Sequence, residues 1–147
     1  MSKISVLMSV YKKENPEYLR ASLESILVQT RTADEILLIE DGPLTQELYQ
    51  VVAEYQKKCD YLHVHAMEQN VQLGRALAKG VELCQYDLIA RMDTDDIAMP
   101  DRLEKEGAYM EAHPEVDVVG GAIREFNDEG TIDRVKNMPK TQEEILE

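Results

Sequence analysis

Short apolar runs alternate along the chain with longer stretches in which apolar residues recur at helical spacing. The short runs predict strands at residues 4–10, 36–39, 62–67, 87–92 and 116–123. The amphipathic stretches predict helices that begin at Pro16, after Thr45, near Leu73 and at Asp101. Strand–helix alternation of this kind predicts an α/β fold, in which a mostly parallel sheet carries helices on both faces.

Capping signals mark the starts of several predicted helices. Asn15 is a candidate N-cap followed by Pro16 at the first helical position, and Thr45 is a candidate N-cap for the second helix. Thr141 and Glu144 form a capping box, but only residues 145–147 remain for the helix that it predicts. We therefore expect residues 1–147 to be one domain that is truncated at its C-terminus.

The composition is that of a soluble globular domain. Of the 147 residues, 44% are hydrophobic and 31% are charged, which suits a chain that buries a core of its own. No apolar run approaches the roughly 20 residues of a membrane helix, and the N-terminus lacks the apolar segment of a signal peptide. We expect a cytoplasmic protein in which the isolated thiols of Cys59 and Cys84 are reduced packing residues.

The formal net charge of −13 restricts the ligands that the protein can bind. An acidic surface repels the phosphate backbone of nucleic acid, so no nucleic-acid partner is expected. A nucleotide diphosphate would also be repelled unless a cation, a basic side chain or a helix N-terminus neutralised it locally.

Chemically active residues gather where the predicted strands end. Ser9-Val10-Tyr11 closes the first strand, Glu40-Asp41-Gly42 follows the second, and Asp93-Thr94-Asp95-Asp96 follows the fourth. Ligands of open parallel sheets bind beyond the carboxyl ends of the strands. One aromatic side chain and five carboxylates are therefore expected at the same edge of the sheet.

Crowded carboxylates repel one another unless a cation or a shared proton lies between them. A divalent ion that prefers oxygen ligands, Mg²⁺ or Mn²⁺, is the natural partner for such a group. An Asp-x-Asp-Asp segment is by itself a weak signal, because acidic loops are usually solvated turns. Its place after an apolar strand, together with the other two strand ends, favours a metal site.

Several blocks of this sequence resemble family 2 glycosyltransferases, which have the GT-A fold, and the blocks occur in the order found in that family. They cover nearly the whole chain, at Val6–Tyr11, Leu23–Thr30, Glu35–Gly42, Asn70–Gly80, Arg91–Leu103 and His113–Gly121. The chain departs from the family pattern at three positions. Glu40 replaces the first acid of an Asp-Asp turn, Gln72 replaces a glycine, and Ala78 replaces a common asparagine.

The resemblance implies a nucleotide-sugar site made of Ser9, Val10, Tyr11, Glu40, Asp41, Arg75, Asp93 and Thr94. In this interpretation Val10 and Tyr11 line the base pocket, and Glu40 accepts a hydrogen bond from the base. Asp41 shapes the turn, and Arg75 helps to hold the donor.

The resemblance also implies a metal ion, Mn²⁺ or Mg²⁺, bound by Asp93, Asp95 and Asp96, with Asp95 as the principal ligand. The implied reaction transfers a sugar with inversion from a UDP-sugar to a saccharide or glycan acceptor, as in polysaccharide biosynthesis. The acceptor site and the general base are expected beyond residue 147. Any peripheral membrane association is expected through that missing part.

Other classes of protein fit the sequence less well. A response-regulator receiver needs an acidic pair after its first strand, and a sugar-1-phosphate nucleotidyltransferase needs a Gly-rich basic loop there. The segment Ser9–Asn15 has neither. Walker A and GxGxxG segments do not occur, which argues against ATPases and dinucleotide enzymes. A non-catalytic module that binds nucleotide-sugars remains an open alternative.

Overall fold

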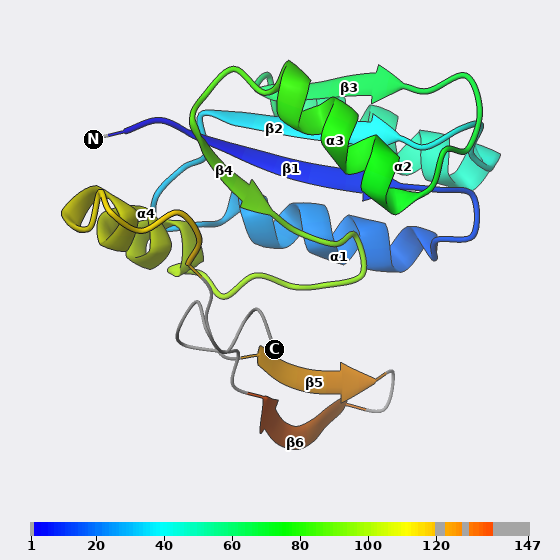
Figure 1. Cartoon of the computed structure of the whole chain (residues 1–147). Coiled ribbons are helices and arrows are strands. Elements are labelled where there is room, and N and C mark those ends of the chain that lie inside the picture. Colours follow the sequence, from blue (N-terminus) through cyan, green and yellow to red (C-terminus); the bar gives the residue numbers. More distant parts are fainter. Residues whose placement is uncertain (1, 120–122, 128–129, 137–147) are drawn as a thin grey trace.

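Four parallel strands form the central sheet of the computed structural model, which describes residues 2–119, 123–127 and 130–136 (Figure 1). These strands are β1 (Ile4–Val10), β2 (Glu35–Glu40), β3 (Leu62–Ala66) and β4 (Leu88–Arg91). Their order across the sheet is β3-β2-β1-β4, so β1 has a strand on each side. β5 (Ile123–Asn127) and β6 (Gly130–Lys136) pair with each other in a separate antiparallel sheet.

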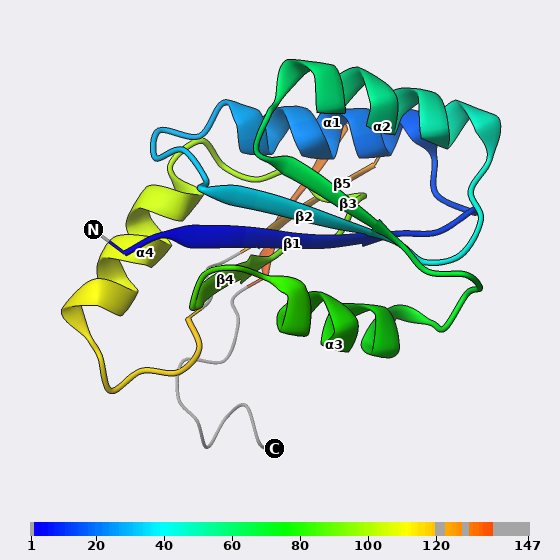
Figure 2. The same cartoon turned by 90° about the horizontal axis from the view of Figure 1, so that it is seen from above.

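Helices cover both faces of the parallel sheet. α1 (Pro16–Leu27) and α2 (Gln46–Lys58) lie on one face, and α3 (Leu73–Leu83) lies on the other (Figure 2). α4 (Arg102–Ala112) contributes Leu103 to the hydrophobic core that α1 and α2 also fill. The α/β prediction with helices on both faces is confirmed.

The predicted N-caps form as expected. Asn15 Oδ1 accepts a hydrogen bond of 2.8 Å from the Glu17 N–H, and Pro16 begins α1. Thr45 Oγ1 accepts one of 3.3 Å from the Leu48 N–H at the start of α2. Each cap satisfies a backbone donor that has no partner within its own helix.

Alternate residues of β1 pack into different halves of the core. Val6, Met8 and Val10 belong to the larger cluster, whereas Leu7 packs with α3 on the other face of the sheet. α3 comes very close to β1 at Gly80, where an added Cβ would lie 2.3 Å from Leu7 Cδ1. Burial on both faces explains why β1 is an almost unbroken apolar run rather than an alternating one.

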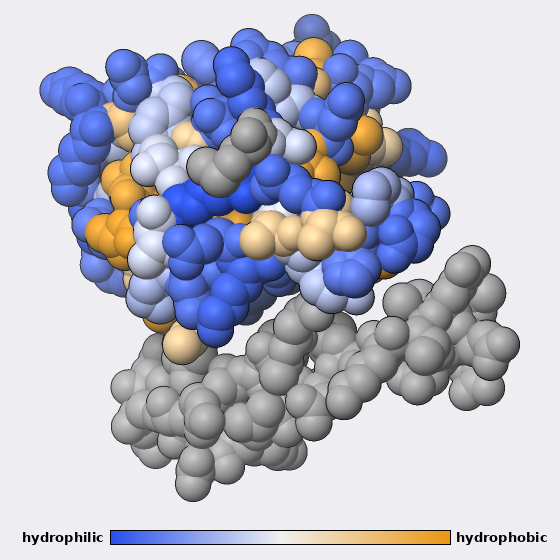
Figure 3. All heavy atoms as spheres, turned by 90° about the vertical axis from the view of Figure 1, so that its left-hand side faces the viewer, coloured by the Kyte–Doolittle hydropathy of each residue, from blue (hydrophilic) through white to orange (hydrophobic). Residues whose placement is uncertain are grey.

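The surface on the side of α4 is mostly hydrophilic, with apolar side chains in a few separate groups (Figure 3). This agrees with the net charge of −13. Among the described residues, no helix is long and apolar enough to cross a membrane.

The strand predicted at residues 116–123 is wrong at residues 116–119, whereas residues 120–122 lie outside the described residues. Residues 116–119 are not in a strand, and Val118 is 74% exposed. Ile123, the last residue of the predicted strand, belongs to β5. Apolar residues favour a strand only where a neighbouring strand can pair with them, and residues 116–119 form no such pairing. The helix predicted from the capping box at Thr141 lies outside the described residues.

Candidate functional site

The ends of β2 and β4 flank the end of β1. The Asp41 N–H donates a hydrogen bond of 2.8 Å to the Val10 carbonyl, which ties the turn after β2 to β1. On the other side the Met92 N–H donates to the Leu7 carbonyl at 3.0 Å, and Thr94 Oγ1 lies 3.4 Å from the Ser9 carbonyl. The three segments predicted to share one edge of the sheet therefore do so.

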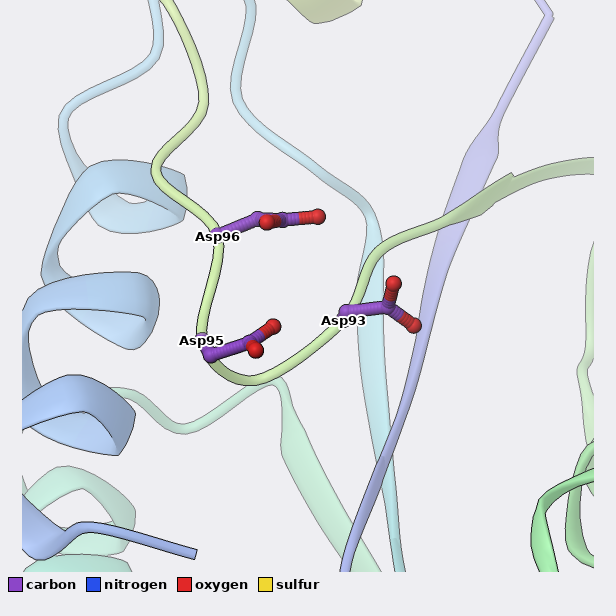
Figure 4. Close-up of side chains that lie close together, drawn as sticks. All are labelled: Asp93, Asp95 and Asp96. Atoms are coloured by element: carbon purple, nitrogen blue, oxygen red, sulfur yellow. The ribbon is translucent and has the colours of Figure 1, made fainter. Parts of the chain in front are cut away.

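Three aspartates lie together in the loop after β4, here called the acidic loop (residues 92–101). Carboxylate oxygens of Asp93, Asp95 and Asp96 lie within 4.8 Å of one another (Figure 4). The Asp96 N–H donates to the Asp93 carbonyl at 3.2 Å, which closes the turn between them. Three carboxylates at this spacing match the oxygen donors that Mg²⁺ and Mn²⁺ prefer.

The neighbouring carboxylates of the acidic loop repel one another. The pKa of the Asp96 carboxyl is raised by partial desolvation and by repulsion from Asp95 and Asp93. Arg91 Nη2 lies 3.0 Å from Asp93 Oδ1 and offsets part of this charge. Arg102 donates to the Arg91 carbonyl at 2.9 Å. Arg91 was not among the predicted site residues, although residues i and i+2 at the end of a strand share one face.

Thr94 is buried, and its hydroxyl is engaged within the protein. Thr94 Oγ1 donates to a carboxylate oxygen of Glu14, which lies in the loop between β1 and α1. The predictions did not include Glu14. A pairing between residues 80 positions apart leaves no local sequence signal that would reveal it.

The turn after β2 is buried and fixed to the segment before α3. Asp41 is 4% exposed, and its Oδ1 accepts a hydrogen bond of 2.7 Å from the Val71 N–H. Asn70 Nδ2 donates to the Asp41 carbonyl at 3.3 Å. Gly42 has φ +87°, and an added Cβ would lie 2.6 Å from Asn70 N, so only glycine fits there. Burial raises the pKa of the neighbouring Glu40 carboxyl.

A hollow of about 370 Å³ lies beside this turn. It is lined by Gln69, Asn70, Val71, Gln72, Gly74 and Arg75. Gln72 has φ +74°, a value that glycine adopts readily and other residues rarely do. Gln72 therefore has a backbone conformation that favours glycine, and it makes no side-chain capping bond to α3.

The other predicted binding residues lie at the same edge of the sheet. Tyr11 is 46% exposed directly after β1. Arg75 lies in the first turn of α3 and is exposed. An arginine and the free N–H groups of a helix start are both suited to anionic groups of a ligand.

Comparison with known families identifies the family to which this chain belongs. The model for "Glycosyl transferase family 2" matches residues 5–147. This chain belongs to glycosyl transferase family 2. The match includes all three strand ends and the acidic loop, and it confirms the family that the sequence blocks predicted.

Curated relatives in the family are glycosyltransferases by name. An uncharacterised glycosyltransferase of Haemophilus influenzae is 48% identical over 145 residues, which are 98% of this chain and 54% of that protein. The amylovoran biosynthesis glycosyltransferase AmsE of Erwinia amylovora is 45% identical over 96% of this chain and 52% of its own length. The chain thus spans about half the length of the curated relatives that it matches.

A third relative has a name that states its reaction. The UDP-Gal:alpha-D-GlcNAc-diphosphoundecaprenol beta-1,3-galactosyltransferase of Escherichia coli is 35% identical over 90% of this chain and 50% of its own length.

Solved structures share the fold at low sequence identity. S. aureus TarS 1-349 in complex with UDP-GlcNAc has a TM-score of 0.67 at 23% identity, over 76% of this chain and 32% of that one. The mannosyltransferase PcManGT of Pyrobaculum calidifontis, in complex with GDP-Man and Mn²⁺, has a TM-score of 0.67 at 15% identity. Its match covers 84% of this chain and 35% of that one. The GT-A fold is confirmed, whereas the roles of individual residues stay predictions.

Proposed function

We propose that residues 1–147 form the donor-binding domain of a metal-dependent glycosyltransferase that uses a UDP-sugar. The observation that carries this proposal is the group of three aspartates within 4.8 Å at the end of β4, on a chain with a net charge of −13. A diphosphate could bind at such an edge only if a cation lay between the two sets of negative charge.

The acidic loop would hold Mn²⁺ or Mg²⁺ through Asp95 together with Asp93 and Asp96. When bound, the ion would offset the charge that develops on the departing diphosphate. Arg91 would keep Asp93 in place through their ion pair of 3.0 Å. Arg75 and the N-terminus of α3 would attract anionic groups of the donor from the other side of β1.

The base would lie against the end of β1. The ring of Tyr11, which is partly exposed, would supply a stacking surface beside the backbone of Ser9 and Val10, and Glu40 would accept a hydrogen bond from the base. Asp41 would act on the ligand only indirectly, because its carboxylate is bonded to the Val71 N–H. UDP is favoured because the E. coli relative, at 35% identity, is named for UDP-Gal.

The acceptor would be a saccharide or glycan, with the whole protein acting in polysaccharide biosynthesis, as the name of the Erwinia relative suggests. Transfer would proceed with inversion, by attack of an acceptor hydroxyl on the sugar carbon. The general base that takes the hydroxyl proton would belong to the half of the relatives' length that this chain does not span.

Calorimetry of UDP binding tests this proposal. UDP should bind with Mn²⁺ or Mg²⁺ present and much more weakly in EDTA, and it should bind more tightly than GDP or dTDP. Equal UDP affinity in EDTA and in Mn²⁺ would contradict the metal site, and preference for another nucleotide would contradict the choice of UDP.

A further inference from the structure

One side of α1, together with the turn that follows the helix, holds the acidic loop through hydrogen bonds. Ser22 Oγ donates to the Asp93 carbonyl at 3.2 Å. Ser25 Oγ accepts from the Ala98 N–H at 3.0 Å and donates to the Ser22 carbonyl at 2.7 Å. Both serines are buried, so water does not compete for these bonds. The middle of the acidic loop is therefore fixed to a helix that comes from a distant part of the sequence.

Gln29 extends this contact to the end of the loop. Its side-chain amide is 7% exposed and uses both of its ends. Nε2 donates to the Met99 carbonyl at 2.6 Å and to the Ser25 carbonyl at 3.0 Å. Oε1 accepts a hydrogen bond of 3.0 Å from the Leu103 N–H.

The bond from Leu103 gives α4 the cap that its own sequence lacks. The N-cap residue of α4, Asp101, makes no side-chain capping bond. The first N–H groups of a helix have no partner within the helix, and Gln29 supplies one from the turn after α1. Gln29 therefore joins the last part of the acidic loop to the start of α4.

An anchor of this kind would counteract the repulsion within the acidic loop. The loop has no helix or strand of its own, and its carboxylates repel one another. Repulsion favours backbone arrangements that separate the aspartates, whereas metal binding needs them close. α1 resists this movement because Leu19, Leu23 and Ile26 fix it in the core.

We propose that Gln29, supported by Ser25, is a positioning residue for the metal-binding aspartates. This inference rests on the proposed function, since it assumes that the acidic loop binds Mn²⁺ or Mg²⁺. Gln29 is not itself a proposed ligand of the ion, and its side-chain amide is hydrogen-bonded to Ser25, Met99 and Leu103. It acts through the backbone of residues 99–103, which sets where the aspartates lie before the ion arrives.

The test is the affinity for Mn²⁺, measured by electron paramagnetic resonance on the protein and its variants. Gln29→Met keeps the length of the side chain and removes all three hydrogen bonds. It should weaken Mn²⁺ binding by about 10-fold, the lower end of the effect of losing a group that is hydrogen-bonded directly to a metal ligand. Exchange of the Leu103 amide proton, followed by NMR, should become faster.

Two controls separate positioning from general stability. Val51→Ala removes methyl groups from the core under α2 and should lower the melting temperature while Mn²⁺ affinity stays within twofold. Gln50→Met makes the same chemical change as Gln29→Met on the exposed face of α2 and should change neither property. Ser25→Ala is a milder second variant in case Gln29→Met does not fold, and it should also weaken Mn²⁺ binding.

Each outcome has one meaning. Mn²⁺ affinity within twofold of the wild type in folded Gln29→Met, or in Ser25→Ala if only that variant folds, would overturn the positioning role. Weak binding in Val51→Ala to the same degree would also overturn it, because the effect would then follow stability alone. A wild-type protein that binds no Mn²⁺ would instead overturn the proposed function, and the metal role of Gln29 with it.

Discussion

The turn after β2 and the acidic loop after β4 stand on either side of β1, and both are rich in carboxylates. In the turn, Asp41 is buried and its carboxylate accepts a hydrogen bond from the Val71 N–H. In the loop, Asp95 and Asp96 are exposed, and the hydrogen bonds to α1 involve the backbone of the loop. The same residue type at the same edge of the sheet is thus hydrogen-bonded and buried on one side and exposed on the other. The difference lies in whether a backbone donor faces the carboxylate.

The most pronounced change is expected for a substitution in the acidic loop. Asp95→Asn should reduce Mn²⁺-dependent UDP affinity by more than about 100-fold, because even outer-shell partners contribute about 10- to 100-fold. Unfolding in urea should show no loss of stability, since the change relieves repulsion between acids. Calorimetry with and without Mn²⁺ measures the first effect. Asp60→Asn, an exposed change after α2, is the control, and an unchanged Mn²⁺ dependence in Asp95→Asn would contradict the assignment.

In the turn after β2, a substitution that disfavours the backbone conformation should lower the stability of the protein. Gly42→Ala should lower the free energy of unfolding by about 1–3 kcal/mol, the usual cost of a left-handed conformation for a residue other than glycine. The contact of 2.6 Å with Asn70 N adds to that loss. Gly74→Ala in α3 is the matched control, because its Cβ meets no atom within 4 Å and alanine favours a helix by about 1 kcal/mol. Urea denaturation should show opposite signs for the two variants, and equal signs would contradict this account of the turn.

Removal of the Asp41 side chain is a second test of the difference between the turn after β2 and the acidic loop. Asp41→Ala leaves the Val71 N–H without its partner and should lower the free energy of unfolding by about 1–3 kcal/mol. Mn²⁺ affinity should stay within twofold of the wild type, the reverse of the pattern for Asp95→Asn. A variant with wild-type stability and weakened Mn²⁺ binding would show that Asp41 belongs to the metal site.

The smallest effect concerns pH. Burial raises the pKa of Glu40 above 4.5 in the folded protein, so the folded state holds this proton over a range where the unfolded state has lost it. The contribution of Glu40 to stability should therefore fall as the pH rises from about 4.5 through the folded pKa. Glu40→Gln has no such proton, so the stability difference in its favour should grow over this range. Denaturation curves at pH 4 and pH 7 measure it, and a difference that does not change with pH would contradict the burial of an ionisable group here.

The sequence predicted the layers of the fold better than the details of the site. Buried parallel strands such as β1 leave an unbroken apolar run, and Asn15 and Thr45 are caps that act within a few residues. Which carboxylates are bonded and which are open depends on contacts across the fold, such as Asp41 with Val71 and Thr94 with Glu14. Such pairings leave no periodic pattern in the sequence.

The failed strand at residues 116–119 has a similar cause, because an apolar run does not reveal whether a strand lies beside it. Gln72 shows the limit for backbone conformation. Its side chain gives no sign that the residue adopts φ +74°, and only the resemblance to a family with glycine there raised the question.

The strand order β3-β2-β1-β4 has a consequence for the folding of the chain during its synthesis. β1 is synthesised before the other three strands of its sheet. Its pairing with β4 joins Ile4 to Leu88, so the residues between them must be synthesised before that side of the sheet can form. Contacts between such distant residues form slowly, because closing a long loop reduces the entropy of the chain. A nascent chain that ends before residue 88 would leave one edge of the apolar strand β1 unpaired, and an unpaired apolar edge favours aggregation.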